Sequence, residues 1–173
     1  GANHQMALEI RPAHDPIKEY GFCGVVVDTT NLQGAIFTWW KDEDGEWQAK
    51  KTITIDPVPA DADDLPDLLK GFGAVPPLVT DIDLSMDDKF LYVACWGLGE
   101  MHQYDVTDPM KPVLAGKVEI GGIVTKTKHK NGKEFVIQYY KKGVNSTCGT
   151  IVYIDQIVNG AQKASELVQQ ILT

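Results

Sequence analysis

Alternating apolar and polar residues predict short strands along most of the chain. In Leu78–Leu84 every second residue, counted from Leu78, falls on one side, and the acidic Asp81 and Asp83 fall on the other. This is the pattern of a half-buried strand, and it stops at an acidic turn with the sequence SMDDK. Phe90–Trp96 is then apolar at both sets of alternate positions, which predicts an interior strand.

Two further strands are predicted after this pair. A glycine turn at Gly97–Gly99 precedes a strand at Glu100–Val106, and a proline-bounded loop separates it from a strand at Val113–Ile120. Four consecutive antiparallel strands with tight turns form a meander of the kind found in one blade of a β-propeller.

The same strand order occurs earlier in the chain. We predict strands at Met6–Pro12, Gly21–Asp28, Ala35–Lys41 and Glu46–Ile55. The turn at Asp42–Gly45 carries the Asp-Gly signature of a hairpin. The two stretches, about residues 6–55 and 78–120, are therefore interpreted as an internal repeat of structure. We expect a domain of two propeller-type blades over residues 6–123.

The segment between the two stretches, Asp56–Pro77, is rich in proline and acidic residues and is too long for an ordinary connection. One interpretation is a solvated surface loop with a short helical turn at Leu65–Lys70. The other is a segment that lines the approach of a substrate, because long loops often carry function.

The composition changes after Gly122, where residues 124–173 form a divergent tail. This tail is predicted to hold two strands, Glu134–Lys141 and Thr150–Ile157, and an amphipathic helix at Gly160–Thr173. The expected fold class is all-β, with two four-stranded antiparallel blades, extra strands and a C-terminal helix.

Composition and charge exclude several classes of function. The chain has 173 residues and a formal net charge of -8, so a nucleic-acid or anionic membrane surface would repel it on average. No apolar run approaches the roughly 18 residues of a membrane helix. The three cysteines form neither a disulfide framework nor a zinc motif. We expect a soluble, cytoplasmic protein with reduced thiols at Cys23, Cys95 and Cys148.

Several phrases together resemble one known family. They are LEIRPAHDP at Leu8–Pro16, GFCGVVV at Gly21–Val27, the long stretch Leu65–Pro109, and LAGKVEIGGI at Leu114–Ile123. Within the long stretch, TDI-x-LS-x-DD-x-FLY is followed by QYD-x-x-DP. The chain resembles the selenium-binding protein family, also called methanethiol oxidases, over about residues 6–135. From about Val136 the tail departs from the family pattern, as in a truncated homologue.

The resemblance implies an internal portion of a seven-bladed propeller. It also implies an oxidoreductase activity: copper-dependent oxidation of methanethiol to formaldehyde, hydrogen sulfide and hydrogen peroxide. Imidazole and sulfur ligands both suit copper. The cysteine implicated in selenium binding and most family histidines would lie outside this portion, so we expect this chain alone to be inactive. The alternative is a non-catalytic binding or oligomerisation module derived from the same propeller.

The implied partners are a small thiol substrate and another copy of the chain joined through blade edges, with no nucleic acid and no membrane. His14 is the metal ligand that the resemblance favours, because it lies in the phrase LEIRPAHDP. As a bare residue, a lone histidine is more often a hydrogen-bonding loop or core residue than a metal ligand. No catalytic residue and no site for an organic cofactor are identified.

The remaining candidate residues have structural interpretations beside functional ones. His102 is predicted to serve in cross-strand packing or at the surface. The acidic residues Asp81, Asp83, Asp87 and Asp88 could suggest a cation site, but they lack the spacing of a calcium loop, and turn building is the preferred interpretation. The four tryptophans could form an aromatic pocket or belong to the core. Cys23 and Cys95 are predicted to be buried and unreactive.

Overall fold

The computed structural model describes residues 3–124, 127–128 and 134–135. The chain divides into two compact units, Gly1–Ile137 and Gln138–Thr173, and all described residues belong to the first. The predicted strand at Thr150–Ile157, the predicted C-terminal helix and most of the predicted strand at Glu134–Lys141 lie outside the described residues.

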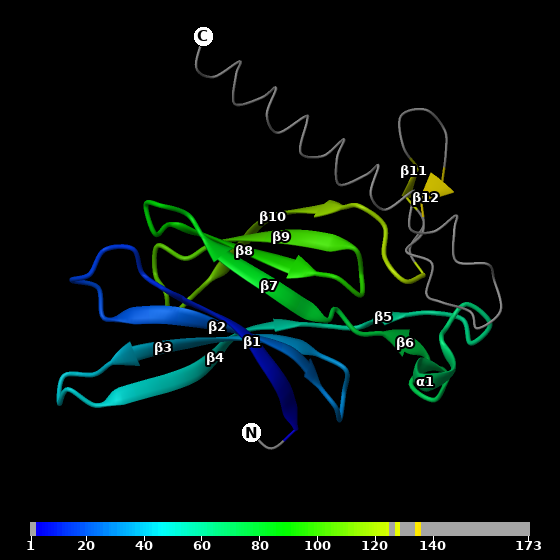
Figure 1. Cartoon of the computed structure of the whole chain (residues 1–173), viewed down its shortest axis with the longest axis horizontal. Helices are drawn as coiled ribbons and strands as arrows, with labels where there is room; N and C mark the ends of the chain where they lie inside the picture. The colour runs from blue at the N-terminus through cyan, green and yellow to red at the C-terminus, as the bar shows by residue number, and fades with distance from the viewer. Residues whose placement is uncertain (1–2, 125–126, 129–133, 136–173) are drawn as a thin grey trace, which may run out of the picture. The chain divides into compact units, whose positions relative to one another are not determined.

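The first sheet contains four antiparallel strands in chain order (Figure 1). They are β1 (His4–Pro12), β2 (Tyr20–Asp28), β3 (Gly34–Lys41) and β4 (Trp47–Ile55). The turn between β3 and β4 ends at Gly45, whose φ of 83° is the left-handed conformation that glycine adopts without steric cost. The predicted strands of this half of the chain are confirmed, with small differences at their ends.

The second sheet repeats this order, again with four antiparallel neighbours. Its strands are β7 (Val79–Leu84), β8 (Phe90–Cys95), β9 (Glu100–Asp105) and β10 (Val113–Glu119). The described chain is thus all-β apart from one short helix. The predicted repeat of two four-stranded meanders is confirmed.

The predicted alternation of β7 is wrong in its first half. Val79, Ile82 and Leu84 are buried, whereas Thr80 is exposed. The register with β8 shifts between Val79 and Asp81, and such a bulge turns the residues before it to the opposite face of the sheet. The inward set therefore begins at Val79 rather than at Leu78.

β8 is an interior strand, as predicted, because β7 and β9 flank it. Its two faces differ in burial. Leu91, Val93 and Cys95 are fully buried, while Tyr92 on the other face is 37% exposed.

The segment between the sheets contains a two-stranded ladder that the sequence analysis missed. β5 (Val58–Pro59) pairs with β6 (Ala74–Val75), and α1 (Asp67–Lys70) lies between them in the chain. The predicted helical turn is confirmed by α1. A further short pair is formed by β11 (Thr127–Lys128) and β12 (Glu134–Phe135).

The core lies where the two sheets meet, because β7 packs against β1 and β2. Both sheets contribute to one cluster of buried side chains, which includes Phe22, Ile36, Ile53, Val79, Ile82, Leu91 and Val93. A Cβ on Gly24 would lie 3.2 Å from a methyl group of Ile82, so glycine permits this close approach. In the part of the chain that the structure describes, no helix is long and apolar enough to cross a membrane.

Candidate functional site

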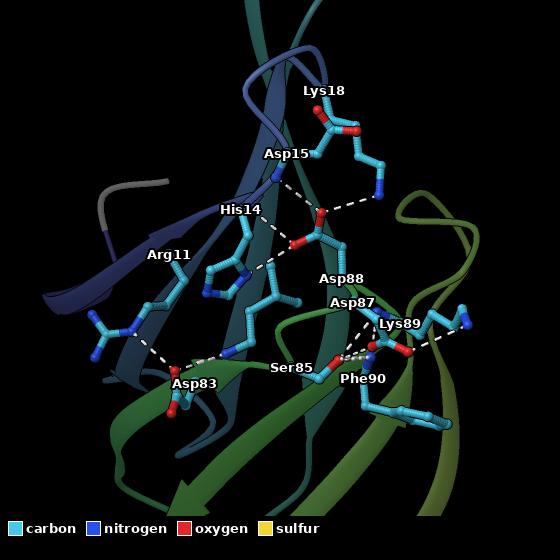
Figure 2. Close-up of polar contacts among 11 residues, drawn as sticks. Arg11, His14, Asp15, Lys18, Asp83, Ser85, Asp87, Asp88, Lys89 and Phe90 are labelled. Carbon is cyan, nitrogen blue, oxygen red and sulfur yellow. Dashed lines mark hydrogen bonds and ion pairs between the residues drawn. The ribbon is translucent and has the colours of Figure 1, made fainter.

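Two equivalent loops, one from each sheet, meet at the candidate site (Figure 2). Residues 13–19 join β1 to β2, and residues 85–89 join β7 to β8. The first loop is closed by a hydrogen bond from the Ala13 amide to the Tyr20 carbonyl, at 3.0 Å. It carries His14, and the second loop carries Asp88.

The β7–β8 turn is built by Ser85 and Asp87. The Ser85 hydroxyl donates to the Asp87 carboxylate at 2.7 Å and accepts the Phe90 amide at 2.9 Å. Asp88 has a φ of 59°, in the left-handed region where aspartate is among the more tolerated residues. The prediction of turn building is thus confirmed for Asp87, whereas the carboxylate of Asp88 points to the other sheet.

The Asp88 carboxylate accepts four hydrogen bonds from the β1–β2 loop (Figure 2). Its Oδ1 accepts the His14 amide at 2.8 Å and lies 3.0 Å from the His14 ring Nδ1. Its Oδ2 accepts the Asp15 amide at 3.2 Å and the Lys18 ammonium at 3.0 Å. The Asp88 side chain is only 2% exposed, so these bonds replace its lost hydration.

Asp88 is ionised at neutral pH. Burial raises the pKa of its carboxyl, but the His14 amide, the Lys18 ammonium, the His14 ring and the Asp15 amide together hold that pKa well below its usual range. The hydrogen bond to Asp88 correspondingly raises the pKa of Lys18. The buried charge is therefore compensated locally.

This charge state decides the tautomer of His14. An ionised carboxylate can only accept hydrogen bonds, so the proton between Asp88 and the ring must lie on Nδ1. In the neutral imidazole, Nε2 then keeps its lone pair. The His14 side chain is 37% exposed, and no hydrogen bond or ion pair joins Nε2 to any described residue. An imidazole in this state can bind a metal ion or accept a proton.

Comparison with known proteins identifies the family. The model of the 56kDa selenium binding protein family (SBP56) matches residues 1–155, which extends past the predicted limit near residue 135. The chain belongs to the selenium-binding protein family.

Other members of the selenium-binding protein family are much longer than this chain. The chain is 36% identical over 124 residues to a protein named methanethiol oxidase from Xenopus tropicalis, covering 72% of this chain and 24% of that protein. It is 34% identical to selenium-binding protein 3 from Arabidopsis thaliana, covering 70% and 23%. The X-ray structure of a hypothetical selenium-binding protein from Sulfolobus tokodaii matches with a TM-score of 0.72 and 51% identity, covering 76% and 29%. The chain thus spans about a quarter of the length of these relatives.

The described residues supply one suitable donor for the copper ion that the resemblance implies. Imidazole is a good copper ligand, and metal-bound histidines usually donate their other ring N–H to a carboxylate or carbonyl. His14 and Asp88 have this arrangement. Among residues 3–124, 127–128 and 134–135, however, no three histidine, cysteine, aspartate or glutamate side chains group as a metal site. The donor chemistry of His14 thus fits a single copper ligand, and the described residues do not group into a complete site.

His102 is buried between its register partners Val93 on β8 and Lys117 on β10, so of its two predicted roles cross-strand packing is confirmed and the surface position is wrong. Its Nε2 lies 2.6 Å from Glu100 and its Nδ1 lies 3.3 Å from the Tyr104 hydroxyl. Lys117 pairs with the other oxygen of Glu100 at 2.8 Å. Both ring nitrogens of His102 are occupied, which suits a structural role. The spacing of Glu100, His102 and Tyr104 at every second residue of one strand could have revealed this cluster.

Cys95 is buried, as predicted, whereas Cys23 is partly exposed, so its predicted full burial is wrong. Burial raises the pKa of both thiols, which lowers the thiolate fraction of each. For Cys95 burial and the nearby Glu100 raise the pKa to about 12, and for Cys23 burial raises it to a smaller degree. Burial also raises the pKa of Tyr104 to about 12. Cys148 lies outside the described residues.

Asp81 and Asp83 face Arg11 rather than a cation site. Arg11 approaches the two carboxylates at 3.7 and 3.6 Å and also pairs with Glu9. Both aspartates are well exposed, with side-chain exposures of 62% and 75%. These contacts therefore favour a surface charge pair over metal binding.

The core interpretation of the tryptophans fits Trp96 but not the exposed Trp47. Trp96 packs against the core cluster. Trp39 and Trp47 contact each other edge to face, with ring centroids 5.4 Å apart, and Trp47 is 60% exposed. The described tryptophans therefore do not share one location.

Proposed function

We propose that this chain takes part in copper-dependent oxidation of methanethiol, with His14 as one imidazole ligand. The observation that carries the proposal is the contact of the buried Asp88 carboxylate with Nδ1 of His14, which places the lone pair of the neutral ring on Nε2 of a partly exposed side chain. Membership of a family whose relatives are named methanethiol oxidase supports it. Each four-stranded sheet would be one blade of a propeller, and a cytoplasmic location belongs to the same proposal.

The residues of this chain would act by position. Asp88 would hold the proton on His14 Nδ1, and Lys18 would balance the carboxylate charge. Bound copper would supply redox chemistry and a soft centre for a thiolate. The remaining ligands and the enclosure of the small thiol would come from outside the described residues, and turnover of the substrate would need all of them.

The alternative function, a non-catalytic binding or oligomerisation module, is less well supported. It would use the blade edges and would assign no ligand role to His14. Relatives that carry an enzyme's name at 36–38% identity favour the enzymatic proposal over this module.

Copper content tests the proposal. The full chain would be loaded with copper, freed of unbound metal by size-exclusion chromatography, and analysed for copper per chain. We expect the wild-type chain to retain more copper than His14→Gln. His4→Gln removes a different imidazole and serves as the matched control. Equal copper in the wild type and His14→Gln, or copper-free wild type, would contradict the proposal.

A further inference from the structure

We propose that Asp88 is a positioning residue, which fixes both the tautomer and the ring direction of His14 from the neighbouring sheet. The use of this arrangement for metal binding rests on the proposed function above. The arrangement itself depends only on described contacts, so it can be tested without metal.

The geometry at Oδ1 restrains the ring as well as its proton. The same oxygen accepts the His14 backbone amide at 2.8 Å and lies 3.0 Å from the ring Nδ1. The backbone contact holds Oδ1 beside His14. Rotation of the His14 side chain would therefore break the contact between Nδ1 and Oδ1. Since the ring is tied through Nδ1, Nε2 is the nitrogen directed away from Asp88 (Figure 2).

The support of Asp88 makes it a firm anchor. Its backbone is fixed in the turn by a hydrogen bond from its own amide to the Ser85 carbonyl, at 2.8 Å. Lys18 and the Asp15 amide occupy Oδ2, which leaves Oδ1 for His14. A side chain that is 2% exposed and makes four hydrogen bonds has few alternative orientations.

The neighbouring Asp87 provides a matched comparison. It belongs to the same turn and carries the same charge, but its side chain is 53% exposed and contacts Ser85 and Lys89. Substitution at Asp87 removes a carboxylate from the turn without touching His14. If the effect on His14 came only from a disturbed turn, substitution of either aspartate would change the His14 ring. If Asp88 positions His14, only substitution of Asp88 would change it.

The test is the ring nitrogen spectrum of the metal-free, ¹⁵N-labelled full chain by NMR. His14→Gln identifies the His14 signals among the four histidines. At a pH where the ring is neutral, we expect the wild type to show protonated Nδ1 and unprotonated Nε2. Asp88→Gly suits a φ of 59° and removes the side chain with its carboxylate, so it should give a mixture of tautomers. Asp87→Asn should match the wild type.

A neutral His14 ring with its proton on Nε2 in the wild type, or an unchanged His14 spectrum in folded Asp88→Gly, would overturn the proposal. The wild-type spectrum shows which ring nitrogen carries the proton, so it tests the predicted tautomer even if Asp88→Gly fails to fold.

Titration with Cu²⁺ alone separates this proposal from the proposed function. Loss of a carboxylate that orients a ligating histidine typically weakens metal affinity about 10–100-fold, which is the loss expected for Asp88→Gly and not for Asp87→Asn. If the wild type bound no Cu²⁺ but kept the predicted tautomer, the metal function would fail and the positioning role would stand. Equal Cu²⁺ affinity of the wild type and Asp88→Gly would contradict a positioning role in metal binding.

Discussion

The two histidine–carboxylate pairs of this protein contain similar groups and differ in what they leave free. His14 contacts Asp88 through Nδ1 at 3.0 Å, and its side chain is 37% exposed. His102 contacts Glu100 through Nε2 at 2.6 Å, its Nδ1 faces Tyr104, and its side chain is 8% exposed. Accessibility and a vacant nitrogen, rather than the presence of a carboxylate partner, distinguish a candidate ligand from a structural residue.

The location of each pair explains the difference. Glu100 and His102 lie two residues apart on β9, within one sheet, so their contact is local. His14 and Asp88 lie 74 positions apart on equivalent loops of different sheets. The first pair can stabilise the interior of one sheet, whereas the second also ties the two sheets together.

The largest expected effect is at the buried pair. Glu100→Ala should lower the free energy of unfolding by about 3 kcal/mol, because it leaves a ring nitrogen of the buried His102 without its hydrogen-bond partner. Chemical denaturation measures this loss. Glu119→Ala is the control, since Glu119 also pairs with Lys117 but is 54% exposed, and it should change stability by no more than about 0.5 kcal/mol. Similar losses of unfolding free energy in Glu100→Ala and Glu119→Ala would contradict a special role for the buried Glu100–His102 pair.

A smaller loss is expected at the pair between the sheets. Asp88→Ala should lower the unfolding free energy by about 1–3 kcal/mol, because four donors lose their acceptor. The partly exposed His14 and Lys18 can regain water, which keeps the loss below that at Glu100. Asp87→Ala should cost less than Asp88→Ala in the same denaturation experiment. A larger loss at Asp87 would show that turn building dominates.

Acid should weaken the Glu100 pair. Burial raises the pKa of Glu100, but hydrogen bonds from His102 and Lys117 outweigh it, so the pKa lies below the ordinary value of 4.5. Because the pKa of Glu100 is lower in the folded than in the unfolded chain, its ionised carboxylate stabilises the fold above about pH 4.5. This stabilisation is lost as the pH falls from 4.5 through the folded-state pKa. The unfolding free energy of Glu100→Gln should therefore fall less between pH 6 and pH 3 than that of the wild type. Parallel curves would contradict this.

The smallest effect concerns the thiol beside the buried pair. Cys95 is fully buried and its thiol has a pKa of about 12, so iodoacetamide at pH 8 should leave it unmodified in the folded chain. Cys23 is partly exposed and should react first. Peptide mass spectrometry after timed labelling compares the two. Faster labelling of Cys95 would contradict its burial.

The strands were largely predictable because their signal is local. Turn residues and period-two alternation gave all eight strands of the two large sheets, including the interior strand β8. The alternation of β7 failed at Thr80, because a bulge inserts a residue without a recognisable sequence mark. The β5–β6 pair was missed because two-residue strands carry no periodic pattern.

The site was only partly predictable. His14 was selected through a family phrase, and it lies between β1 and β2. Its partner Asp88 was assigned to turn building, because the sequence shows the turn but not the sheet that packs across it. The contact depends on how β7 packs against β1 and β2 and on the left-handed backbone of Asp88. Neither feature can be deduced from the spacing of residues.

The most direct test of the link between the two loops is a double-mutant cycle on His14→Ala and Asp88→Ala, measured as free energies of unfolding. Residues in direct contact typically show a coupling of about 0.5–3 kcal/mol, and we predict a value in this range. The parallel cycle of His14→Ala with Asp87→Ala should show coupling near zero. A coupling for His14 and Asp88 no larger than that of this control would contradict the account.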